Sequence, residues 1–217
     1  MIDYDDRPIN RNKLKEKQMR LFTYIVTHDT GFAPNPFWGY CTLATCKPRV
    51  RKAAVKGDWI VGLTSKALGH KLVYAMKVEE KITFDQYFND SRFKKKKPDP
   101  DSDDSERKCG DNMYYREKGC LTYAQMEGDY HVASDFNRDT SSEYVLVSAR
   151  DDFFYFGKDA KEMPQELLSK IVIGRGERFK FEPETIEEVI EFVCKLPKGM
   201  NAEPREFRKY QKLRCHK

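Results

Sequence analysis

The sequence predicts a single α/β (α+β) domain in which a twisted mixed sheet is flanked by helices. Several short runs show the alternation of side chains, with a period of two residues, that is typical of strands. A run near the C-terminal end, residues 183–196, carries apolar residues at helical spacing instead. The 217 residues are enough for one full core, and 14 Phe and 12 Tyr supply bulky side chains for it.

The composition limits the classes of protein that need to be considered. The chain is 39% hydrophobic and 35% charged, and its net charge of +5 permits nucleic-acid binding without requiring it. No apolar run approaches the length of a membrane-spanning helix, and the N-terminal residues have no apolar segment of the signal-peptide type. We therefore expect a cytoplasmic protein with no membrane partner, whose oligomeric state the sequence does not reveal.

We expect a polar arm at 1–19, one domain at 20–200 and a basic C-terminal helix at 201–217. The first strand, 20–27, is apolar on both faces, as a central strand should be. The other strands are expected at 58–65, 71–80, 130–133 and 143–148.

Two helices and one insertion complete the predicted domain. A helix begins near Thr45 or Cys46, because a proline such as Pro48 is tolerated only in the first turn. A second helix, 183–196, is expected to pack its apolar face on the sheet through Ile186, Val189, Ile190 and Val193. The segment 94–108 reads KKKKPDPDSDDSERK and contains no apolar residue, so we expect a charged, exposed insertion.

The loop between the first strand and the first helix is the candidate binding site. It is rich in Gly and Pro, yet it also carries His28, Asp29, Asn35, Phe37 and Trp38. Long loops held between rigid elements often bind ligands. An amide or carboxylate there could read the edge of a base, and an aromatic ring could stack on it.

Trp59 opens the next strand and is a second candidate for stacking, with packing in the core as the alternative. Basic residues follow the loop at Lys47, Arg49 and Arg51, and Arg175 lies in a glycine loop further along. These four side chains are candidates for holding phosphate, with a solvated helix face as the alternative.

The six cysteines form no CxxC pair, and no histidine stands at zinc-finger spacing from them, so we predict neither a metal nor a cofactor. Cys46 is a candidate nucleophile because a thiol at the start of a helix has a lowered pKa. A small buried thiol is the alternative. The sequence also lacks the Walker loop, the dinucleotide-binding glycines, the zinc-deaminase signature, GxSxG and the kinase motifs.

The stretch HDTGFAPNPFWGYCTLATCKPRVRKAAVKGDWIVG resembles the signature of the nucleotide-modification-associated domain family, type two. YVLVSARDDFFYFGKDAKEMP and the glycine loop near GRGER resemble further blocks of that bacterial and phage family. The resemblance covers roughly residues 20–200 and implies a role associated with nucleotide or DNA modification. It does not imply a particular reaction.

A second resemblance concerns the fold. A strand that opens with Gly-Asp-Trp, the strand KLVYAMKVEE and the run FDQYF together are similar to PUA-like domains, including the EVE and ASCH groups. This similarity implies a small pseudo-barrel that holds a nucleobase, as an alternative to the open mixed sheet.

Three functions remain open from the sequence. The first is a module that binds a nucleobase or nucleotide, free or in nucleic acid with a modified base. The second is an enzyme acting on a nucleotide or base, with Asp29, His28 or Cys46 as acid, base or nucleophile. The third is a protein-interaction domain that binds no such ligand. The binding module is favoured here because the residues show no mutually arranged catalytic pair or triad.

Overall fold

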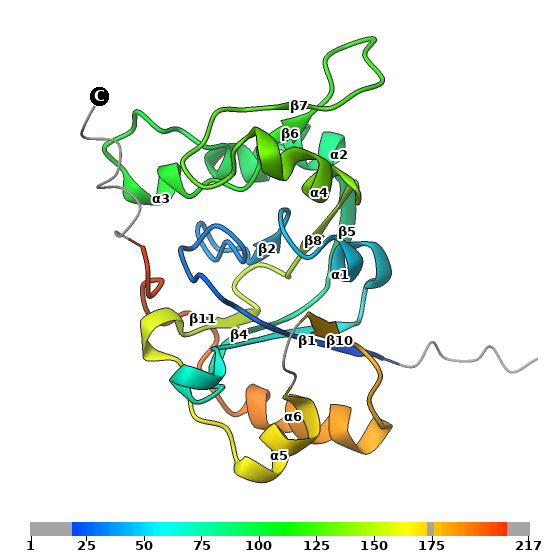
Figure 1. Ribbon diagram of the computed structural model, residues 1–217, viewed down its shortest axis with the longest axis vertical. Helices are drawn as coiled ribbons and strands as arrows, with labels where there is room; N and C mark the ends of the chain where they lie inside the picture. Colours follow the sequence, from blue (N-terminus) through cyan, green and yellow to red (C-terminus); the bar gives the residue numbers. More distant parts are fainter. Residues whose placement is uncertain (1–18, 173–175, 208–217) are drawn as a thin grey trace, which may run out of the picture.

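The computed structural model describes residues 19–172 and 176–207, and it confirms a mixed α/β fold (Figure 1). The larger sheet has six strands in the order β10-β1-β3-β4-β9-β11, of which the β1–β3 and β9–β11 pairs are parallel and the others antiparallel. Its strands are β1 (Leu21–Ile25), β3 (Trp59–Leu63), β4 (Leu72–Lys77), β9 (Phe153–Tyr155), β10 (Glu177–Arg178) and β11 (Gly199–Met200).

Two smaller sheets lie beside the larger one. An antiparallel sheet has the order β2-β8-β5, from β2 (Thr42–Leu43), β8 (Tyr144–Val147) and β5 (Glu80–Thr83). A hairpin pairs β6 (Tyr114–Tyr115) with β7 (Ala124–Gln125). The strands of the described ranges thus belong to separate sheets, and the PUA-like pseudo-barrel is not observed.

The helices are short, apart from the last one. The α-helices are α1 (Pro48–Ala53), α2 (Phe84–Asn89), α3 (Ser105–Lys108), α4 (Phe136–Thr140), α5 (Gln165–Ile171) and α6 (Pro183–Cys194). The 3-10 turns are η1 (Lys66–Leu68), η2 (Ser91–Lys96), η3 (Ala133–Asp135) and η4 (Gly157–Asp159). None of the helices in the described part of the chain is long and apolar enough to cross a membrane.

Each face of the six-stranded sheet is covered by a different layer. In Figure 1, α5 and α6 lie below the sheet, and the three-stranded sheet with α1 to α4 lies above it. The strand β1 contributes side chains to the core on both faces of the sheet. Leu21 belongs to the core cluster on the side of α6, and Phe22 belongs to the cluster on the side of β8. On α6, Val189 and Val193 are fully buried, and each such side chain stabilises the fold by about 1.5–3 kcal/mol.

The structure confirms four of the expected strands and the helix at 183–196. The strand expected at 143–148 is β8 and lies in the smaller sheet. The prediction of a strand at 130–133 is wrong. Residues 131 and 132 have no regular structure, and η3 follows them. The His131 ring turns toward α4 while Val132 is 60% exposed, so the alternation of a half-buried strand is not maintained.

The segment 94–108 differs from the exposed loop expected there. It contains the end of η2 and all of α3, and the Lys96 side chain is only 1% exposed. The Lys96 ammonium donates hydrogen bonds to the carbonyls of Asn35 and Tyr40 and to the Asn35 side chain. The C-terminal helix expected at 201–217 lies mostly outside the described residues, and its part up to 207 shows only turns.

Candidate active site

Cys46 lies in the short connection between β2 and α1, where the backbone has an unusual conformation. Cys46 and Lys47 have φ angles of 56° and 36°. This left-handed conformation costs about 1–2 kcal/mol for each residue other than glycine. Such strain persists only where surrounding contacts hold it, and it is common at functional sites. Pro48 then begins α1, so a partly exposed cysteine is presented on a tight turn.

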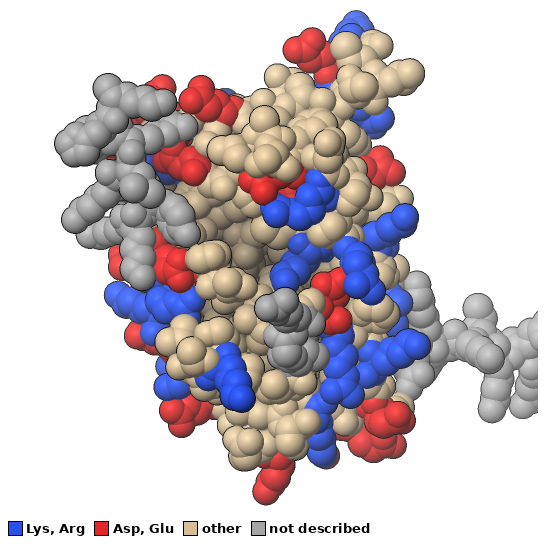
Figure 2. All heavy atoms as spheres, viewed as in Figure 1, with Lys and Arg blue, Asp and Glu red and all other residues tan. Residues whose placement is uncertain are grey.

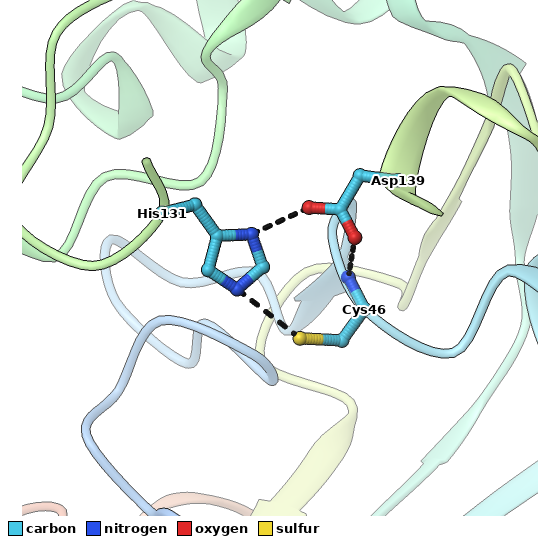
Figure 3. Close-up of side chains that lie close together, drawn as sticks. All are labelled: Cys46, His131 and Asp139. Atoms are coloured by element: carbon cyan, nitrogen blue, oxygen red, sulfur yellow. Dashed lines mark hydrogen bonds and ion pairs between the residues drawn. The ribbon is translucent and has the colours of Figure 1, made fainter. Parts of the chain in front are cut away.

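The Cys46 thiol faces a histidine and an aspartate from a distant part of the chain (Figure 3). Its Sγ lies 3.4 Å from Nε2 of His131. The other ring nitrogen, Nδ1, lies 2.5 Å from Oδ2 of Asp139. The second carboxylate oxygen, Oδ1, accepts a 3.0 Å hydrogen bond from the backbone N–H of Cys46. Sulfur, imidazole and carboxylate therefore stand in the order of a nucleophile, a base and the group that orients the base.

The charges of the histidine and the aspartate favour each other. Burial lowers the pKa of His131, but hydrogen bonds to Asp139 and to Cys46 outweigh burial and raise this pKa to about 9. Burial raises the pKa of Asp139, but the hydrogen bond and charge of His131, the Tyr114 hydroxyl and the charge of Arg138 together outweigh burial, so this pKa lies below its ordinary value. Near neutral pH the pair is therefore an imidazolium and a carboxylate. An imidazolium beside a cysteine sulfur is the arrangement in which the thiolate acts as a nucleophile.

Three further side chains hold the histidine and the aspartate in place. The Tyr114 hydroxyl donates a 3.0 Å hydrogen bond to Oδ2 of Asp139. The Gln125 amide donates one of 3.0 Å to the backbone carbonyl of His131. The Phe32 ring packs on the imidazole with ring centroids 4.6 Å apart. The β6 residue thus holds Asp139, while β7 and the loop after β1 hold His131.

Cationic side chains gather beside the triad of Cys46, His131 and Asp139. Figure 2 shows a hollow on the face that carries α1, α4 and β10, with Lys and Arg side chains on the side of α1 and β10. Lys47 follows the thiol directly, and Nη2 of Arg138 lies 3.4 Å from Nε2 of the imidazole. A local excess of positive charge favours an anionic ligand such as a phosphate.

The same triad offers three ligand atoms for a metal ion, which lie within 4.8 Å of one another. A catalytic zinc ion would use three such ligands. However, the Asp139 carboxylate accepts hydrogen bonds from His131, Tyr114 and the Cys46 backbone. These are the contacts of a carboxylate that orients a histidine rather than of a direct ligand. The geometry therefore favours a cysteine nucleophile over a metal centre.

The two polar residues predicted at the start of the loop lie in another part of the fold. Asp29 is 1% exposed and accepts hydrogen bonds from the Tyr155 hydroxyl and from the backbone N–H of Arg205. Burial raises the pKa of Asp29. His28 is exposed and lies 3.1 Å from a carboxylate oxygen of Glu206. Both residues thus contact the segment that follows β11.

The predicted loop residues Asn35, Phe37 and Trp38 differ in exposure. Asn35 is fully buried and donates to the carbonyl of Cys109, while its own side-chain oxygen accepts from the Lys96 ammonium. Phe37 is 1% exposed. Trp38 is partly exposed, has a φ of 57° and packs against Phe37 with ring centroids 5.6 Å apart. Trp38 is therefore the most exposed of the three.

The remaining predicted residues also separate into buried and exposed groups. Arg51 is fully buried, and Trp59 is 7% exposed and packs on the ring of Phe154 in the core. The Arg49 side chain is 73% exposed and pairs with Glu177. Arg175 lies outside the described residues.

The sequence prediction includes Cys46 but misses His131 and Asp139. These two residues lie eight positions apart in HVASDFNRD, and this spacing is itself a weak signal, since polar residues are common there. No local pattern connects them to a thiol 85 residues earlier in the chain. Only the packing of α1 against α4 and β8 brings the three together.

The comparisons with known proteins address the family of the chain. Residues 18–211 match the family described as nucleotide modification associated domain 2. No curated protein and no solved structure matches the chain. The matched region contains Cys46, His131 and Asp139 together with all but the last few residues of the expected C-terminal helix. The resemblance seen in the sequence is therefore confirmed, and the chain belongs to the nucleotide modification associated domain 2 family.

Proposed function

We propose that this protein is an enzyme of nucleotide modification in which Cys46 is the nucleophile, His131 the general acid and base, and Asp139 the orienting carboxylate. The observation that carries the proposal is the unbroken series of contacts from the Cys46 sulfur through both ring nitrogens to the carboxylate. This geometry favours an enzyme over the binding module that the sequence alone favoured, because a purely binding site has no need of an oriented thiol–imidazole pair.

The chemistry that suits the triad is acyl transfer. The Cys46 thiolate attacks a carbonyl carbon of an ester or amide, and the C=O electron pair moves to oxygen. When the intermediate collapses, the bond to the leaving group breaks, and the proton on Nε2 of His131 passes to that group. The resulting thioester is then attacked by water or by an acceptor amine, whose proton returns to the imidazole as Cys46 leaves.

The substrate we propose is a nucleotide, free or within nucleic acid, whose base carries or receives the acyl group. Family membership supports the nucleotide, and the cations Lys47 and Arg138 beside the triad support a phosphate on it. Trp38 is partly exposed and remains a candidate for stacking on a base. Arg49 is a further candidate for phosphate contact, in competition with its partner Glu177.

The first test is the reactivity of the Cys46 thiol, because it needs no knowledge of the substrate. The protein is treated with iodoacetamide at pH 6, and the alkylation of each cysteine is followed by peptide mass spectrometry. Cys120 and Cys194 are exposed and serve as internal controls. We expect Cys46 to react at least tenfold faster than the controls, and His131→Ala to remove this advantage. Equal rates in the native protein would contradict the proposed nucleophile.

The second test looks for the covalent intermediate and for the competing metal centre. Intact-mass spectrometry of protein incubated with acylated nucleotides should show an acyl adduct that Cys46→Ala cannot form. Elemental analysis of the same protein decides the alternative. One equivalent of zinc that is lost in Cys46→Ala would favour a metal centre over a nucleophile.

A further inference from the structure

The buried guanidinium of Arg51 bridges the two chain segments that build the triad. Arg51 lies on α1, five residues after Cys46, and is fully buried. Its Nε donates a 2.8 Å hydrogen bond to the backbone carbonyl of Cys46. Its Nη2 donates one of 2.6 Å to the backbone carbonyl of Asp139. Its Nη1 donates to the carbonyls of Ser142 and Tyr144, at 2.6 Å and 2.7 Å.

These bonds act on the strained turn at Cys46. The peptide groups of this residue are held on both sides, because its N–H donates to the Asp139 side chain and its C=O accepts from Arg51. The Asp139 residue is held in the same way, through its side chain and through its own carbonyl. The guanidinium thus fixes the distance between the backbone of the nucleophile and the backbone of the orienting carboxylate.

We infer that Arg51 is a positioning residue, which sets the register of α1 against α4 so that the Cys46 thiol meets the imidazole of His131. This inference rests on the proposed function. The planar fork of arginine reaches several carbonyls at once, whereas a lysine ammonium is a single point charge and cannot reproduce the fork. A buried arginine that only filled space or balanced charge would not need bonds to the backbone of two triad residues, Cys46 and Asp139.

The test is Arg51→Lys, which keeps the charge and removes the fork. We expect the variant to fold and the alkylation rate of Cys46 at pH 6 to fall about tenfold, while the rates of Cys120 and Cys194 stay unchanged. Val50→Ala is the matched control. Val50 is the fully buried neighbour on the same helix, so its truncation lowers stability without touching the triad carbonyls. The control should retain fast Cys46 alkylation.

A second variant, Arg51→Ala with added methylguanidinium, tests the same contact by chemical rescue. Rescue of Cys46 reactivity by methylguanidinium but not by methylammonium is expected, because only the former can donate to carbonyls of both segments. Fast alkylation in Arg51→Lys would overturn the inference. Loss of folding in both variants, where Val50→Ala remains folded, would also overturn it, since Arg51 would then support the whole fold. Slow alkylation in the native protein would instead contradict the proposed nucleophile, so the two failures are distinguishable.

Discussion

Replacing Asp139 with asparagine tests whether the triad holds the charges inferred for it. The amide has nearly the shape of the carboxylate, and its oxygen can still accept from the Cys46 N–H. Its nitrogen, however, is only a donor and cannot accept from a protonated His131 or from the Tyr114 hydroxyl. The imidazolium then lies beside the Arg138 guanidinium without its carboxylate partner. We expect the pKa of His131 to fall from about 9 to below its ordinary value of 6.5.

The size of the effect follows from the raised pKa. A group whose pKa is higher in the folded protein than in the unfolded chain stabilises the fold below the unfolded pKa. This stabilisation is lost as the pH rises through the folded pKa of about 9. For His131 the linkage relation gives about 3 kcal/mol at pH 6, about 2 kcal/mol at pH 7.5 and almost nothing at pH 10. The lowered pKa of Asp139 reports the same pair, so it is not added.

Urea unfolding of the native protein and of Asp139→Asn, at pH 6 and at pH 10, measures the difference in their free energies of unfolding. Asp139→Asn should lower the free energy of unfolding by about 3 kcal/mol at pH 6, equivalent to a fall of about 6–12 °C in Tm for a chain of this size, and by much less at pH 10. Asp135→Asn on the same segment is the control, and its partly exposed pair with Arg138 should contribute under about 1 kcal/mol. A loss that is equal at the two pH values, or an NMR titration that leaves the pKa of His131 near 9 in the variant, would refute the charge assignment.

Two further predictions concern the surroundings of the triad. Lys96→Met should lower the free energy of unfolding by about 3 kcal/mol, because it leaves the buried acceptors of Asn35 and Tyr40 without their donor. In the same urea unfolding experiment, Lys95→Met at an exposed position should change this free energy by less than about 0.5 kcal/mol. Equal effects of the two substitutions would show that the buried ammonium contributes nothing. Lys47→Ala should weaken nucleotide binding about tenfold in calorimetry and reduce the slope of log affinity against log salt by about one. Lys52→Ala, at an exposed position, should do neither. If the nucleotide affinity of Lys47→Ala equals that of the native protein, Lys47 is not part of the proposed site.

Much of the fold was predictable because its signals are local. The helix α6 buries helically spaced side chains, and the strand β1 is apolar on both faces, and both patterns are visible in the sequence. The aromatic run Phe153–Tyr155 is also buried on both faces, but it has only three residues, and the sequence did not reveal it as the strand β9. The burial of Lys96 was missed because its signal is not local. The ammonium is buried where it can donate hydrogen bonds to carbonyls of a loop 56 to 61 residues earlier in the chain.

The candidate site was predictable only in part. Cys46 stood out because it precedes a helix that begins with a proline. Its neighbours in the sequence suggested His28 and Asp29 as partners, because residues of suitable chemistry lie within twenty positions. In the fold, Asp29 turns to Tyr155 instead, and the partners of the thiol come from the segment between β7 and β8. The sequence therefore offered Cys46 as a candidate nucleophile but not His131 as its base, because tertiary packing decides which histidine reaches the thiol.

The charges around the thiol bear on the class of substrate. The imidazolium of His131 is balanced by the Asp139 carboxylate, and the Arg138 guanidinium lies 3.3 Å from that carboxylate and 2.9 Å from Asp135. Lys47 is added to this balanced group, and burial lowers its pKa. A partly buried cation is stabilised when an anion binds next to it. A nucleotide phosphate would give this partly buried ammonium an anionic partner, which a neutral peptide would not. The electrostatics of the site thus support a nucleotide over a peptide as the carrier of the carbonyl group in the proposed reaction.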